Sequence, residues 1–80
     1  MIFLIEYDRS SGTIAEMRKF EDSSRKLAED ARLELELKLN REGVEHEVVL
    51  LEAPNEEALR RTHSRYFESV AEIAREKLIA

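Results

Sequence analysis

The chain has 80 residues, of which 39% are charged and 42% hydrophobic, and its net charge at pH 7 is −5. An acidic chain with well-mixed charges has no long-range attraction to nucleic acid or anionic lipid, and a chain without cysteine forms no disulfide or thiolate metal site. We therefore predict a single globular domain over residues 1–80, without a cofactor and located in the cytoplasm.

The first apolar run, residues 1–5, is too short for a membrane span and has no basic region before it, as a signal peptide would. It predicts a buried strand. The turn cluster DRSSG at residues 8–12 follows, so a β-hairpin is the economical interpretation. We expect the return strand over residues 13–20, although Thr13 and Glu16 also fit a capping box that would start a helix there.

Residues 33–39, LELELKL, alternate leucine and charge as a half-buried strand would. Three features nevertheless favour a helix from residue 25 onward: an apolar stripe at four-residue spacing, opposite charges four apart, and the absence of β-branched residues. The stripe consists of Leu27, Ala31, Leu35 and Leu39. We predict a helix that is capped by residues 22–24 and ends at residues 40–43, with a second hairpin as the alternative.

The clearest strand is VEHEVVLL, residues 44–51, which is β-branched and apolar. Pro54 stops it, and Asn55 is placed to cap a final helix that we expect to run to near Ala80. The apolar face of that helix would carry Leu59, His63, Tyr66, Val70, Ile73 and Ala74.

These elements predict an α+β fold, a small two-layer β-β-α-β-α domain. Its three-stranded, mostly antiparallel sheet would have the first strand in the centre and two helices on one face. That arrangement leaves the other sheet face bare, although the first strand is apolar on both faces.

Three apolar surfaces therefore stay uncovered: the second sheet face, the outer side of the first helix, and the overhang of the last helix. A homodimer or higher homo-oligomer would cover them together. The predicted interface residues are Leu33, Leu37, Phe3, Ile5 and Tyr7. The leading hypothesis is a small self-associating interaction domain that binds a protein partner or a small ligand.

The segment 60–67, RRTHSRYF, concentrates three arginines, a histidine and a tyrosine in an otherwise acidic chain. Because glutamates stand four residues from the arginines, a solvated and salt-bridged face is the plainer interpretation. The alternative is a ligand site formed by His63, Tyr66, Arg60, Arg61 and Arg65. Two other functions stay open on that basis: a regulator that contacts nucleic acid through the arginines, and a small-molecule binding protein or enzyme with a His63/Tyr66 pocket.

Catalytic and metal motifs are weak. Two histidines without cysteine, at unrelated spacing, do not form a metal signature, and we predict no metal site. The serines of residues 10–11 lie in a turn without the context of a catalytic nucleophile. An enzyme is not the leading prediction, and Asp8, His63 and Tyr66 would be its first candidate residues. For His46 we expect a structural role.

Overall fold

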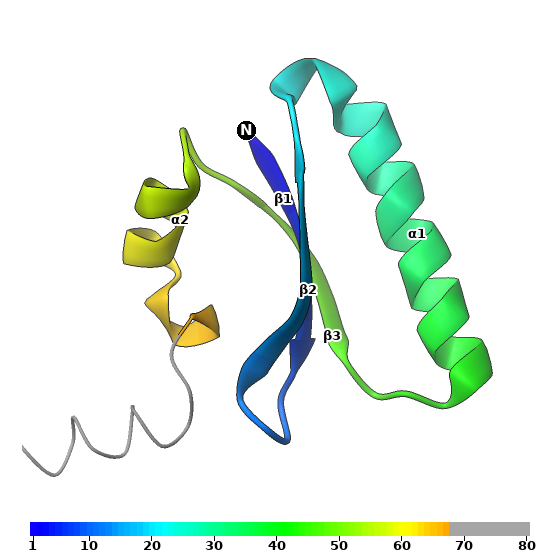
Figure 1. Ribbon diagram of the computed structural model, residues 1–80. Coiled ribbons are helices and arrows are strands. Elements are labelled where there is room, and N and C mark those ends of the chain that lie inside the picture. Colours follow the sequence, from blue (N-terminus) through cyan, green and yellow to red (C-terminus); the bar gives the residue numbers. More distant parts are fainter. Residues whose placement is uncertain (68–80) are drawn as a thin grey trace, which may run out of the picture.

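The computed structural model describes residues 1–67 of the chain (Figure 1). Its elements are the strands β1 (Ile2–Asp8), β2 (Thr13–Phe20) and β3 (Glu47–Glu52) and the helices α1 (Arg25–Glu42) and α2 (Glu56–Thr62). A 3₁₀ turn precedes α1, and another follows α2. The α+β class and the element order that we predicted are confirmed, and residues 13–20 form a strand rather than a helix.

The sheet has the order β2-β1-β3, with both neighbours antiparallel to β1, so the predicted central position of the first strand is confirmed. Directly opposite residues share a face of an antiparallel sheet. Leu4 lies opposite Arg18 on one side and Leu50 on the other, so these three residues share one face. Gly12 closes the hairpin between β1 and β2 with a positive φ of 69° and donates its N–H to the carbonyl of Asp8.

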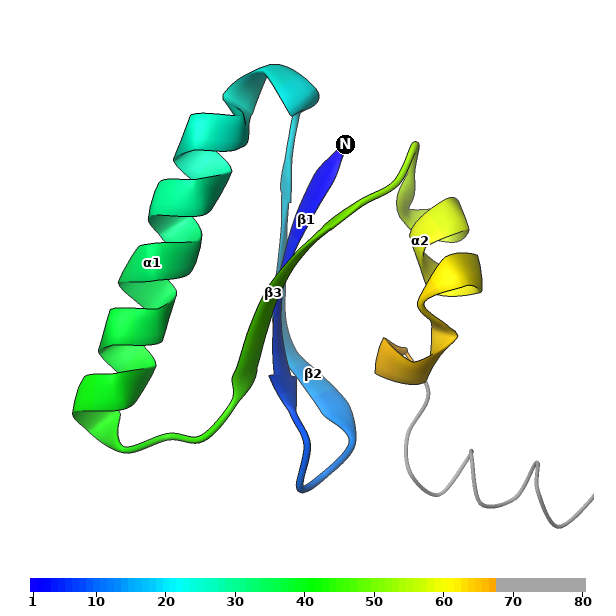
Figure 2. The ribbon, with the colours of Figure 1, turned by 180° about the vertical axis from the view of Figure 1, so that it is seen from behind.

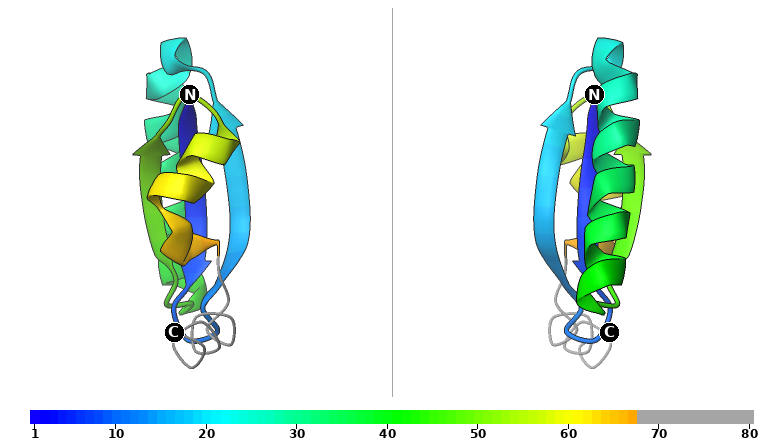
Figure 3. Two further views of the ribbon diagram at one scale, coloured as in Figure 1. Left: turned by 90° about the vertical axis from the view of Figure 1, so that its left-hand side faces the viewer. Right: turned by 90° about the vertical axis from the view of Figure 1, so that its right-hand side faces the viewer.

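The two helices lie on opposite faces of the sheet, so the domain has three layers (Figures 1 and 3). Our prediction of two layers with both helices on one face was wrong. The physical reason is β1, in which residues 2–7 are all buried. A strand that is apolar on both faces needs a cover on each. Seen from behind, the sheet is again sandwiched between α1 and α2 (Figure 2).

The helix α1 covers one face with the buried side chains of Ala28, Ala31 and Leu39. It ends at Gly43, which has a φ of 68° and donates its N–H to the carbonyl of Asn40. The predicted helix and its end are thus confirmed, and the strand alternative for residues 33–39 was wrong. One member of the predicted stripe was misplaced: Leu27 is 62% exposed, because the buried side of the helix is centred near Ala28.

The helix α2 begins as predicted, with the side chain of Asn55 accepting a hydrogen bond from the N–H of Ala58. It ends at Thr62, and His63 leaves the helical conformation with φ −125° and ψ 44°. A continuous helix through residue 67 was therefore a wrong prediction. Threonine, histidine and serine are weak helix formers, and the Thr62 hydroxyl bonds back to the Ala58 carbonyl. The remainder of the predicted helix, with Val70, Ile73 and Ala74, lies outside the described residues.

The core beneath α2 depends on Leu59, which is 0% exposed and packs with Phe3 and Ile5 of β1. Leu59→Ala is expected to lower the free energy of unfolding by about 2–5 kcal/mol, because it removes buried methyl groups and leaves a cavity. The matched control is Leu27→Ala, at an exposed leucine, which should cost less than about 0.5 kcal/mol. Urea denaturation measures both values, and equal costs would contradict the assigned core.

Candidate functional site

A histidine and two carboxylates meet at the end of the sheet next to the β1–β2 hairpin. Glu6 and Asp8 lie two residues apart on β1, and His46 lies just before β3. His46 Nδ1 is 2.5 Å from Glu6 Oε2, and His46 Nε2 is 3.7 Å from Asp8 Oδ2. Because Glu6 is only 9% exposed, its carboxylate needs a polar partner, and His46 supplies it.

The hairpin turn lowers the pKa of Asp8 to about 2, from an ordinary 3.8. The largest cause is the hydroxyl of Ser10, which donates to Asp8 Oδ1 at 2.7 Å, and Ser11 adds to it. The N–H of Ser10 also donates to the same oxygen at 2.9 Å. The same hydrogen bonds hold the Asp8 carboxylate in the hairpin turn.

A second polar cluster joins the β1–β2 hairpin, the start of β3 and the turn after α2. Arg9 Nε donates to Glu47 Oε2 at 3.2 Å, and this bond lowers the pKa of Glu47 and raises that of Arg9. The hydroxyl of Tyr66 donates to Glu47 Oε1 at 3.3 Å. Beside it lies a hollow of about 470 Å³, lined by Arg9, Ser10, Glu45, His46 and Glu47. The hollow therefore offers charged and polar groups of both signs, and one nitrogen of the arginine that lines it, Arg9 Nε, already bonds Glu47.

The predicted ligand residues His63 and Tyr66 lie in different settings. The Tyr66 ring is buried and packs edge-on against Tyr7, with ring centroids 4.9 Å apart. Burial is the main cause that raises the pKa of Tyr66. His63 ends α2, and its carbonyl accepts the N–H of Tyr66 at 3.1 Å. Tyr66 thus serves the core and His63 the end of the helix.

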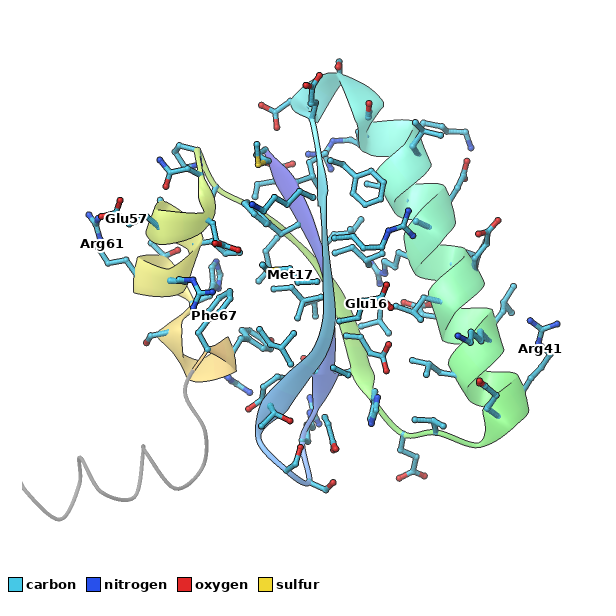
Figure 4. All side chains as sticks on the ribbon, in the orientation of Figure 1. Glu16, Met17, Arg41, Glu57, Arg61 and Phe67 are labelled. Carbon is cyan, nitrogen blue, oxygen red and sulfur yellow. The ribbon has the colours of Figure 1, made fainter. Side chains whose placement is uncertain are left out.

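The three arginines that we predicted as a patch are spread out and have partners in the chain. Arg61 pairs with Glu57 at 2.9 Å on the outer side of α2 (Figure 4). The guanidinium of Arg60 lies 4.6 Å from the centre of the Phe67 ring. That of Arg65 lies 5.2 Å from the centre of the Tyr66 ring. The arrangement matches the salt-bridged face that the sequence favoured over an aligned nucleic-acid patch.

The predicted interface residues divide into two groups. Phe3 and Ile5 are 0% exposed and Tyr7 is 7% exposed, because α2 covers their sheet face. The bare second face that we expected is therefore occupied within the chain. Leu33 and Leu37 are 56% and 53% exposed on α1, as the helical pattern predicted.

A groove between α1 and β3 was missed by the sequence analysis. It consists of two hollows of about 460 Å³ and about 270 Å³ along the β3 edge of the sheet. Apolar side chains in its walls include Leu33, Leu39, Val44, Val48 and Leu50. A signal was present in the sequence, since the strand that we placed at a sheet edge carries four apolar residues in a row and no charge between them.

Comparisons with known proteins add no assignment. The chain matches no protein-family model, and neither the search of curated proteins nor that of solved structures finds a significant match. Within residues 1–67, no group of three or more histidine and acidic side chains is placed to hold a metal ion. No helix in that part of the chain is both long and apolar enough to cross a bilayer.

The hydrogen bonds in the β1–β2 hairpin lead to a prediction for the pKa of Asp8. Ser10→Ala is expected to raise the pKa of Asp8 from about 2 toward 3.8, because the strongest hydrogen bond to the carboxylate is lost. An NMR titration of the Asp8 carboxyl carbon measures the shift. Ser64→Ala, at an exposed turn elsewhere, is the control and should leave the titration unchanged. An Asp8 pKa that stays near 2 in Ser10→Ala would show that other groups depress it.

The same pKa predicts the direction of acid destabilisation. Since the folded pKa of Asp8 lies below its unfolded value, its contribution to stability is complete above about pH 4. The contribution is lost as the pH falls toward 2. In Asp8→Asn this part of the acid loss should be absent, which chemical denaturation at a series of pH values between 2 and 5 would show.

Proposed function

We propose that the chain is a homodimeric interaction domain of the cytoplasm, which presents the surfaces of the dimer to a protein partner or a small ligand. The observation that supports this function is the exposure of Leu33 and Leu37, each more than half exposed. They stand four residues apart on α1 and therefore form one continuous apolar patch on its outer side.

The size of the domain makes this patch significant. A chain of 80 residues buries only about 60–65% of the surface that its unfolded form exposes, so it has little apolar surface to spare. Fully burying a leucine side chain gains about 1.5–3 kcal/mol. A second copy that covers Leu33 would add a large share of the stability that such a small domain can reach.

Self-association is also the function that the other sites favour. The arginines have partners within the chain, Tyr66 is used in the core, and His46 is used by Glu6. These groups are committed to folding. Leu33 and Leu37, by contrast, are two of the large apolar side chains of residues 1–67 that the fold leaves exposed.

Light scattering over a wide range of protein concentration tests the proposal. We expect a molar mass of twice 9.3 kDa at high concentration, falling toward 9.3 kDa on dilution. Leu33→Glu should raise the dissociation constant by more than about tenfold, because it places a charge in the covered patch. The control Leu27→Glu changes an equally exposed leucine about 120° away around the helix and should leave the constant unchanged. A mass of 9.3 kDa at every concentration would overturn the proposal.

A further inference from the structure

We propose that two copies of the chain pair through their β3 edges, in antiparallel orientation, to form one continuous six-stranded sheet. This inference rests on the proposed function, since it specifies how self-association occurs. It starts from the two outer strands of the sheet, which differ in the way that edge strands of natural proteins are protected.

The β2 edge is protected against pairing with another chain. It carries the exposed charges of Glu16, Arg18 and Lys19, and its register with β1 shifts between Glu6 and Tyr7. Exposed charges and bulges are the usual devices that block an edge. In Figure 4, Glu16 lies on the α1 side of the sheet and Met17 on the α2 side. The strand β2 therefore carries a charged side chain on the face that α1 covers.

Within residues 1–67, the middle of the β3 edge has no such protection, and its charged residues stand only at the two ends of the strand. Its residues 48–51 are all apolar, and they lie at the outside of the sheet with β1 as the neighbour on one side. Each of them is only half-buried although α1 and α2 cover the two faces. An unpaired apolar edge of this kind is a template for a further strand.

The hydrogen-bond pattern identifies which groups a second copy would reach. The N–H of Ala53 donates to the carbonyl of Met1, and Glu52 lies directly opposite Ile2. Met1 and Ala53 are therefore a hydrogen-bonded pair, and Ile2 and Glu52 are a non-hydrogen-bonded pair. Along β3, the backbone N–H and C=O groups point toward β1 at one residue and away from it at the next. The N–H and C=O groups of Val48 and Leu50 consequently point away from β1, toward the open edge.

Two-fold pairing of these edges also brings the helices to packing distance. In an antiparallel pair of strands the two-fold axis is perpendicular to the sheet, so the two α1 helices lie on the same face. The helix α1 packs over β1 and β3 (Figure 3). With strands about 4.8 Å apart, a helix above the β1–β3 boundary would lie about 10 Å from its copy, which is close to the distance of 8–10 Å at which helices pack.

The facing sides of the two helices have complementary charges. The side of α1 next to the groove carries Arg25, Glu29, Arg32 and Glu36 around Leu33. Arg32 and Glu36 form an ion pair within the chain at 2.8 Å. Because the second helix runs in the opposite direction, an arrangement centred near these residues places the Arg32–Glu36 pairs of the two copies side by side, with Arg32 of each near Glu36 of the other. Leu33 then lies between the helices, whereas Leu37 is turned further outward.

One register of the two paired β3 strands also satisfies their outward-pointing backbone groups. With Val49 on the two-fold axis, Val48 lies opposite Leu50 of the second copy, so the outward-pointing groups of these residues pair with one another. The same register places His46 opposite Glu52 of the second copy, and no two glutamates face each other.

A single cysteine tests this register, because the natural chain has none. In Val49→Cys the two thiols would lie on the axis at the separation that a disulfide requires. We expect air oxidation to convert most of this variant to a covalent dimer that keeps the circular dichroism spectrum of the unaltered chain. The control Lys19→Cys, on the β2 edge, should stay largely monomeric under denaturing electrophoresis. Equal cross-linking of both variants would overturn the inference.

Amide hydrogen exchange of the unaltered chain gives a second test that needs no substitution. The amides of Val48 and Leu50 should exchange more than about tenfold more slowly at concentrations where the dimer forms than on dilution. The matched controls are Met17 and Lys19, whose amides point outward from the β2 edge by the same alternation and should exchange quickly at every concentration. Fast exchange at Val48 and Leu50 in the dimer would overturn the β3 pairing.

The two proposals fail in different ways. A dimer with unprotected Val48 and Leu50 amides and no Val49→Cys cross-link would overturn the β3 pairing and leave self-association standing. A monomer at every concentration would overturn both.

Discussion

The burial of β1 on both of its faces is the constraint on which the rest of the structure depends. Residues 2–7 alternate between the two faces and are all buried, including Glu6. A strand of this kind is stable only in the centre of a sheet with a cover on each side. The order β2-β1-β3 and the placement of α1 and α2 on opposite faces both follow from it.

Because each helix covers one face of the sheet, other surfaces stay uncovered. Among the elements of residues 1–67, none covers the outer side of α1 or the open edge of β3. The exposed Leu33 and the strand residues Val48 and Leu50 line the same groove. One partner copy can therefore cover both, which is simpler than separate partners for each surface.

The buried and half-buried polar side chains also stabilise the fold, by pairing with one another. Glu6 occupies a position of β1 that α1 and the sheet nearly enclose, and His46 provides its partner from the chain that leads into β3. Glu47 likewise joins Arg9 of the hairpin to Tyr66 after α2. These contacts tie the start of β3 to the hairpin and to the last described turn.

The sequence by itself determined the elements, because each depends on local signals: the two-sided apolar run of β1, the turn DRSSG, the charge pairs and missing β-branched residues of α1, and the cap at Asn55. It also determined that Leu33 and Leu37 are exposed, since a helical period settles which side chains oppose the buried ones. Only the tertiary structure decided which face each helix covers, so it alone showed that Phe3 and Ile5 are buried within the chain. Only the tertiary structure brought His46 to Glu6 and Tyr66 to Tyr7, because these contacts join residues far apart in the sequence, and no local pattern encodes the distance between them.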